Sequence, residues 1–151
     1  MLTHIHADFV SGHFDLAKKT GATIVFGPSA KAGFEFHEAK DGEVFKIGGI
    51  SLAWLHTPGH TMESSSMVLA DEKGKKVAVF TGDTVFIDDV GRPDLAVSKD
   101  ITKEDLAGFL YDSITNKILT LPDDIIIYPN HGAGSACGKK LSKKRSDTLG
   151  N

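Results

Sequence analysis

The 151-residue chain lacks several features that are typical of particular classes of protein. Its single cysteine, Cys137, excludes an intrachain disulfide framework and fits a reducing compartment. No apolar run approaches the roughly 20 residues that span a membrane, and no signal-peptide pattern opens the chain. The net charge of −3 lacks the basic excess of nucleic-acid binders. We therefore expect one cytoplasmic domain over residues 1–151, with neither nucleic acid nor membrane as a partner.

Helix and strand signals alternate along the chain, as in an α/β domain. Apolar runs predict strands at 23–26, 44–47, 50–55, 66–69, 77–80 and 125–128. A short helix is expected over 10–20, with Leu16 and Ala17 buried and Gly21 ending it. A second helix is expected up to Ile118, and Thr102 with Asp105 predicts a capping box at its start. The segment 33–40 has no clear period and is expected to be a loop.

Side chains that can bind a metal recur near the ends of the predicted strands, where α/β folds commonly place their sites. Six residues share this property: His4, His6, Asp8, His60, Asp83 and His131. The first three alternate along an extended segment, so their side chains share one face. Imidazole and carboxylate are ligands of Zn²⁺ and Fe²⁺. Each residue alone has an ordinary structural explanation, but their recurrence indicates a metal site.

Four motifs follow one another: THIHAD at 3–8, TPGHT at 57–61, TGD at 81–83 and His131. In this order they resemble the metallo-β-lactamase superfamily, which implies an αββα sandwich. Family members carry several strands before the first motif and a helical segment after the last. The resemblance therefore implies a sandwich incomplete at its N-terminus and a chain truncated at both ends. An exposed sheet edge would then favour pairing of two copies as a homodimer.

Three further segments look like the persulfide dioxygenase branch, most of all bacterial members often fused to rhodanese domains: ADFVSGH at 7–13, VGRPDL at 90–95 and HGAGSACGK at 131–139. This branch implies one Fe(II) per chain, with His4, His60 and Asp83 as ligands and catalytic centre. Its reaction oxidises a thiol persulfide with O₂ to sulfite and the free thiol. Two imidazoles and one carboxylate leave open positions on iron for O₂ and substrate.

The neighbours of this triad leave a second enzyme class open. His6, Asp8 and His131 are expected beside the ligands, either orienting them through hydrogen bonds or holding a second metal. Binuclear hydrolases of the superfamily have a histidine where this chain has Phe9, which cannot bind a metal. The sequence thus favours one metal. The alternatives are a zinc-dependent thioester hydrolase of the hydroxyacylglutathione hydrolase type and an inactive domain fragment.

Two residues and one basic run are candidates for substrate binding. Arg92 is expected either to bind a substrate carboxylate or phosphate, or to pair with a nearby aspartate at 88, 89 or 94. Cys137 is expected either to contact a persulfide or to fill a small buried space. Five basic residues within 139–145 form a solvated helix face or steer an acidic thiol. No motif distinguishes glutathione from coenzyme A as the thiol carrier.

Overall fold

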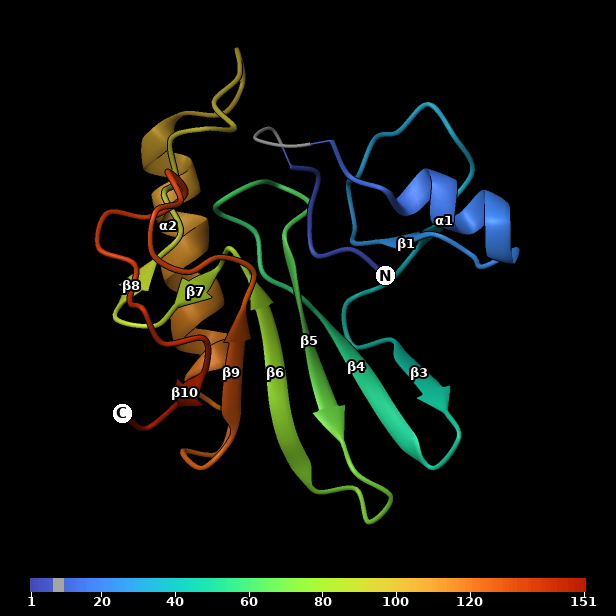
Figure 1. The fold of residues 1–151 in the computed structure, drawn as a ribbon. Coiled ribbons are helices and arrows are strands. Elements are labelled where there is room, and N and C mark those ends of the chain that lie inside the picture. Colours follow the sequence, from blue (N-terminus) through green and yellow to red (C-terminus); the bar gives the residue numbers. More distant parts are fainter. Residues whose placement is uncertain (7–9) are drawn as a thin grey trace.

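The computed structural model describes residues 1–6 and 10–151. Its elements follow in this order (Figure 1): α1 His13–Thr20, β1 Val25–Phe26, β2 His37–Glu38, β3 Val44–Ile47, β4 Ile50–His56, β5 Ser65–Ala70, β6 Lys76–Gly82, β7 Val85–Phe86, β8 Asp89–Val90, α2 Lys103–Ser113, the π-helical turn η1 Ile114–Ile118, β9 Ile126–Pro129 and β10 Asp147–Thr148. Within the described residues, no helix has the length and apolar character to cross a membrane.

A six-stranded sheet in the order β10-β9-β6-β5-β4-β3 forms the centre of the molecule. Strands β3 to β6 are successively antiparallel, whereas β9 returns parallel to β6 after the chain has passed through α2. The strands β4, β6 and β9 therefore run in the same direction and end at one edge of the sheet (Figure 1). The loops that leave these three strands meet at that edge, which is where the predicted ligands lie.

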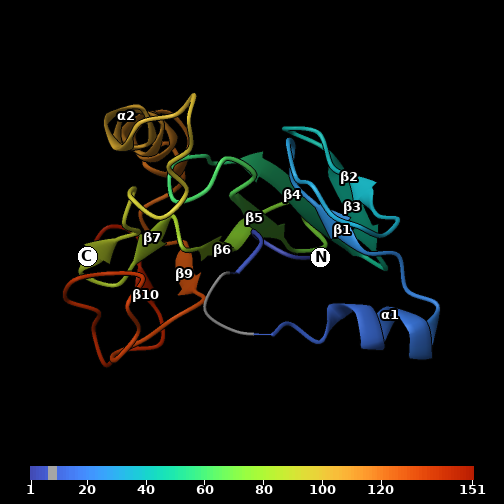
Figure 2. The ribbon, with the colours of Figure 1, turned by 90° about the horizontal axis from the view of Figure 1, so that it is seen from above.

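The sheet carries an apolar core on each face, because neighbouring residues of a strand point to opposite sides. Val68 of β5 belongs to one core, together with Val79, and Met67 belongs to the other, with Trp54. Helix α2 lies on one side of the sheet and α1 on the other (Figure 2). The parallel pair β1–β2 adds Val25 to the second core. This is the expected α/β architecture of the superfamily.

The hairpin 44–47/50–56, the pair β5–β6 and the capping box of α2 confirm the predictions from the sequence. The second helix changes to a π-helical turn at Ile114, where the sequence predicts a continued α-helix. The sequence also predicts a strand near 125–128 that is buried throughout. Instead this strand alternates, with Ile127 buried and Tyr128 40% exposed. Ile127 packs into the core with Val68 and Val79, and the ring of Tyr128 on the other face stacks on that of Phe80.

The prediction for the first helix is partly wrong. The helix begins at His13 rather than at residue 10, and Leu16, expected to be buried, is 61% exposed. None of the eight residues of α1 is buried, so the prediction that Ala17 is buried is wrong as well. The rings of His13 and Phe14 contact those of Phe26 and Phe34, respectively. The predicted end of the helix is confirmed, because Gly21 has a φ of +73° and donates its N–H to Ala17 O. The expected loop 33–40 contains β2.

Candidate metal centre

The backbone after β4 reaches the sheet edge through a turn that presses against α2. Gly59 has a φ of +140°, and a Cβ at this position would lie 2.4 Å from Cβ of Leu110. Only glycine combines this conformation with so close an approach. Thr57 N–H, two residues earlier, donates to Ser64 O at 2.8 Å and closes the loop. His60 is thus presented from a turn fixed at both ends.

A buried hydroxyl network joins the loop that carries His60 to the loop that carries Asp83. Thr57 Oγ1 lies 3.0 Å from Ser66 Oγ and 2.9 Å from Thr84 Oγ1. All three hydroxyl residues are at most 1% exposed. Buried hydroxyl groups need partners, so any displacement of one loop would break bonds to the other. The network fixes the two loops relative to each other.

Three side chains converge at this edge: His4, His60 and Asp83. Asp83 Oδ2 lies 3.4 Å from His60 Nε2 and 3.8 Å from His4 Nε2. The donor atoms of the three residues all lie within 4.8 Å of one another, and each residue is at most 3% exposed. The triad expected from the sequence is therefore assembled from three distant parts of the chain.

Hydrogen bonds at the far side of each ring aim both imidazoles inward. His60 Nδ1 lies 3.0 Å from Arg92 O, and since a carbonyl oxygen only accepts, Nδ1 carries the proton and Nε2 keeps its lone pair. His4 Nδ1 lies 3.1 Å from Thr3 Oγ1, which also accepts from Asn130 Nδ2 at 2.9 Å. These contacts hold both Nε2 atoms toward Asp83, as metal-binding histidines require.

The electrostatics of the centre suit a cation. Burial, reinforced by the charges of His6, His60 and His131, lowers the pKa of His4 to about 2, so this imidazole is neutral at physiological pH. Neither carboxylate oxygen of Asp83 accepts a hydrogen bond from the part of the chain that the structure describes. A buried carboxylate without donors is costly unless a cation balances it. The residues present therefore fit a metal ion.

Two of the expected neighbours also lie at the centre. His131 Nε2 is 3.2 Å from Asp83 Oδ2, and the ring of His6 has its centroid 4.1 Å from that of His4. Asp8 and Phe9, on which two further predictions depend, lie outside the described residues.

Arg92 forms the ion pair that the sequence left open. Its Nε and Nη2 donate to the two carboxylate oxygens of Asp94, each at 2.7 Å, and its Nη1 donates to Ala136 O at 3.3 Å. The guanidinium thus braces the loop before Cys137, and its binding to substrate stays a prediction. Cys137 is buried and borders a small cavity of about 80 Å³ together with His4 and His60.

The basic run 139–145 is irregular rather than helical. Lys143 and Arg145 line an open cavity of about 470 Å³ beside Asn130 and His131. Steering of an acidic thiol by this run stays a prediction.

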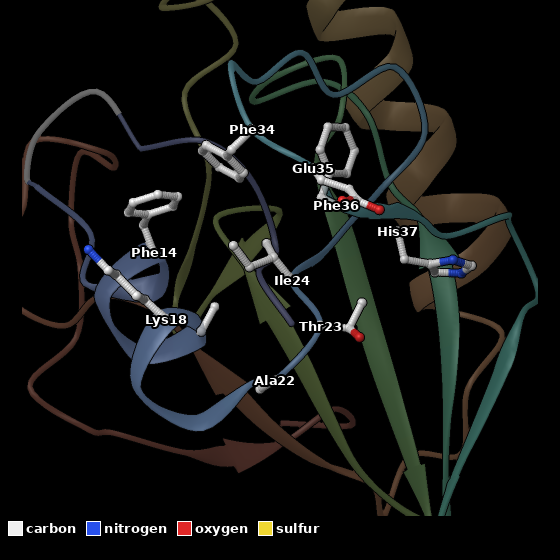
Figure 3. A pocket seen from close by; sticks show the side chains of 10 residues that line it. Phe14, Lys18, Ala22, Thr23, Ile24, Phe34, Glu35, Phe36 and His37 are labelled. Carbon is white, nitrogen blue, oxygen red and sulfur yellow. The ribbon is translucent and has the colours of Figure 1, made fainter.

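A separate cleft of about 770 Å³ lies between α1 and the segment 34–37 (Figure 3). The ring of Phe14 lies beside that of Phe34, with centroids 5.7 Å apart. Lys18 and His37 are the polar side chains of basic character along its lining (Figure 3). The triad does not line this cleft, so the metal centre and this large hollow are different places.

Sequence reasoning missed the residues that orient the ligands. Thr3 directly precedes His4, and Asn130 directly precedes His131. Adjacency to a candidate site residue is the one signal that could have found them. The carbonyl group of Arg92 could not be foreseen, because every residue has one and only the folded loop brings this one to His60.

The sequence of the chain is similar to those of known proteins. The sequence model of the metallo-beta-lactamase superfamily matches residues 1–131. A probable hydroxyacylglutathione hydrolase of Schizosaccharomyces pombe is 33% identical over 131 residues, which cover 87% of this chain and 46% of the relative. The mitochondrial persulfide dioxygenase of Homo sapiens is 34% identical over 130 residues, covering 85% of this chain and 46% of that protein.

Solved structures show the same relationship. A metallo-beta-lactamase from Staphylococcus aureus subsp. aureus COL superimposes with a TM-score of 0.86 at 40% identity, over 98% of this chain and 46% of that one. The chain thus spans about half the length of these similar proteins.

Proposed function

The chain belongs to the metallo-β-lactamase superfamily, a metal-dependent group, and within it we propose a mononuclear Fe(II)-dependent persulfide dioxygenase. One observation carries the proposal: a buried set of two imidazoles and one carboxylate, His4, His60 and Asp83, with their donor atoms within 4.8 Å. Such a set holds one ion on one side and leaves its other positions open, which is typical of non-haem iron oxygenases. The resemblance of the motifs and the 34% identity to a persulfide dioxygenase support the substrate class.

The overall reaction converts a thiol persulfide, O₂ and water into the free thiol, sulfite and two protons, with sulfur oxidised and O₂ reduced. Fe(II), when bound by the triad, supplies the redox chemistry. The protein contributes orientation and exclusion of water. Arg92 O and Thr3 Oγ1 orient the two imidazoles, and the small cavity beside Cys137 admits only the terminal part of a substrate.

The second candidate is a zinc-dependent thioester hydrolase, because relatives named as probable hydroxyacylglutathione hydrolases are 31% and 33% identical to this chain. Such a hydrolase uses zinc to lower the pKa of a bound water. Phe9, where the binuclear pattern has a histidine, weighs against two zinc ions at the usual positions. A fragment without activity is the third outcome, which the same experiment distinguishes.

The deciding experiment is metal analysis after anaerobic purification, followed by O₂ uptake with glutathione persulfide and with coenzyme A persulfide. We expect about one iron per chain and O₂ uptake with sulfite formation. Asp83→Ala should lose both the iron and the activity, whereas Asp100→Ala, which removes an exposed carboxylate, should keep them. Two zinc ions per chain with thioester hydrolysis would replace the proposal by the hydrolase, and absence of metal would leave an inactive fragment.

A further inference from the structure

The end of α2 and the π-helical turn η1 contact the loop between β4 and β5, which carries His60 (Figure 2). We propose that Ser113 and Lys117 are positioning residues for the metal centre, because they fix the backbone from which His60 reaches the ion. The inference rests on the proposed function in one respect, namely that His60 binds the metal. It assigns a role to a segment that lies outside every sequence motif named above.

The hydroxyl of Ser113 holds the turn directly before His60. Ser113 is 3% exposed, and its Oγ donates to Pro58 O at 2.8 Å. A serine in a helix commonly points to solvent or bonds a carbonyl of its own helix. This serine instead reaches a carbonyl 55 residues earlier in the chain. The bond fixes the plane of the peptide between Pro58 and Gly59, and with it the direction in which the chain enters His60.

Leu110, one turn of the helix before Ser113, restrains the same peptide from the opposite direction. A Cβ at Gly59 would lie 2.5 Å from Leu110 Cα, so the backbone of this turn is in direct contact with the helix. Leu110 itself is buried. The turn therefore cannot move toward the helix, and the hydrogen bond from Ser113 opposes movement away from it.

Lys117 holds the start of the same loop, at the last residue of β4. Its Nζ donates to His56 O at 2.6 Å and to Asp41 Oδ2 at 2.7 Å. The other carboxylate oxygen of Asp41 accepts from His56 N–H at 2.8 Å. Both backbone polar groups of His56 are therefore bonded to the Lys117–Asp41 pair. Because partly exposed ion pairs contribute little to stability, we expect this pair to matter more for the position of the loop than for the fold.

The three contacts form one continuous surface of the helix. The side chains that make them are three and four positions apart, so they are neighbours on one face: Leu110, Ser113 and Lys117. They meet the loop in reverse order, at residues 59, 58 and 56. The π-helical turn Ile114–Ile118 begins directly after Ser113 and contains Lys117, and such turns within helices are frequent at functional sites.

These contacts set a quantity that the other supports of the centre do not set. The carbonyl of Arg92 aims the ring of His60, and the other two ligand candidates come from different segments of the chain. The α2–η1 contacts fix the position of the His60 backbone instead. A metal-binding constellation must be held within about 0.5 Å of its productive geometry. A loop released from Ser113 or Lys117 should therefore bind the ion more weakly and in a different geometry.

Competition for Co²⁺ against a chromophoric chelator tests the assignment, because the visible spectrum of bound Co²⁺ also reports its coordination geometry. We expect Ser113→Ala to bind Co²⁺ about 10- to 100-fold more weakly and to shift the visible bands at saturating Co²⁺. Lys117→Met keeps the aliphatic stem but removes the ammonium group, and it should weaken Co²⁺ binding about 10-fold. Thr115→Val is the matched control, because the Thr115 hydroxyl donates to Tyr111 O of its own helix at 2.8 Å. It should keep both the affinity and the spectrum.

Urea unfolding of the metal-free variants separates positioning from structural support. Lower stability together with wild-type Co²⁺ affinity and spectrum in Ser113→Ala and Lys117→Met would make both residues structural supports and overturn the assignment. If Ser113→Ala does not fold, the same two Co²⁺ measurements on Lys117→Met decide. Wild-type protein that binds Co²⁺ beside unaffected variants would refute the positioning roles alone. A wild-type chain that binds no Co²⁺ would refute the metal centre, and with it the proposed function.

Discussion

Gly91 offers the sharpest test of how tightly the backbone encloses the centre. Gly91 follows β8, and its backbone passes directly over Asp83. A Cβ added at Gly91 would lie 1.7 Å from Asp83 O and 3.4 Å from Cβ of His60. Real Cβ atoms essentially never come within 3.0 Å of another heavy atom, so Gly91→Ala must open this contact by at least 1.3 Å. The moving part is backbone, which cannot rotate away as a side chain could.

The expected cost follows from that displacement. Overpacking of this kind lowers the free energy of unfolding by about 1–3 kcal/mol. Alanine also restricts the unfolded chain more than glycine does, but this stabilises the protein by only about 0.4–1 kcal/mol. The metal site should suffer more, because disturbing the support of a ligand typically costs about 10- to 100-fold in metal affinity. We therefore expect Gly91→Ala to fold with reduced stability and to bind Co²⁺ at least ~10-fold more weakly.

The assay is competition for Co²⁺ against a chromophoric chelator, together with urea unfolding of the metal-free protein. Gly108→Ala is the control, since a Cβ at this position in α2 meets no atom within 4 Å. It should gain up to about 1 kcal/mol from helix propensity and keep its metal affinity. Wild-type Co²⁺ affinity in Gly91→Ala would refute the claim that this loop sets the position of Asp83.

Three further predictions concern pH, helix capping and the hydroxyl network. The pKa of His4 is about 2 in the folded protein and 6.5 in the unfolded chain, so the unfolded chain binds more protons between these pH values. The free energy of unfolding of the metal-free protein should therefore fall by about 1.4 kcal/mol from pH 7.5 to 5.5. Urea unfolding of His4→Gln should show a flatter pH dependence. Thr102→Ala removes the hydroxyl that accepts from Asp105 N–H at 3.1 Å and should cost about 1 kcal/mol without changing metal content. Thr57→Val removes a buried hydrogen-bond partner of Thr84, so it should lower the free energy of unfolding by about 1–3 kcal/mol and weaken Co²⁺ binding. Thr57→Ser keeps the hydroxyl and should retain wild-type stability and Co²⁺ affinity. Equal Co²⁺ affinity in the two variants would contradict a role for the network.

Local patterns along the chain are sufficient to predict much of the sheet. The alternation around Gly48–Gly49 predicts the β3–β4 hairpin, because a two-residue turn and period-two apolar residues act within a few positions. The capping box at Thr102 is equally local, since its two hydrogen bonds join residues three apart. The candidate ligand residues are also identifiable, because imidazole and carboxylate side chains recur beside strand ends.

Burial is predicted less well, because it depends on what covers a face. Leu16 has the spacing of a buried helical residue and Tyr128 that of a buried strand residue, yet both are exposed. Their environment is set by neighbouring layers, about which the periodicity of one segment carries no information. The short strands β7, β8 and β10 escape prediction for the same reason, since two-residue pairings depend on distant partners.

The sequence by itself determined the chemistry available to this protein: six side chains that can bind a metal, a phenylalanine at position 9 and one cysteine. The tertiary structure alone decided how these groups meet. The parallel return of β9 beside β6 brings Asp83 and His131 to one edge, and the Arg92 carbonyl selects the nitrogen that His60 presents. The physical reason is that ligand type is a property of single side chains. Ligand geometry, in contrast, is produced by contacts between residues that are far apart along the chain.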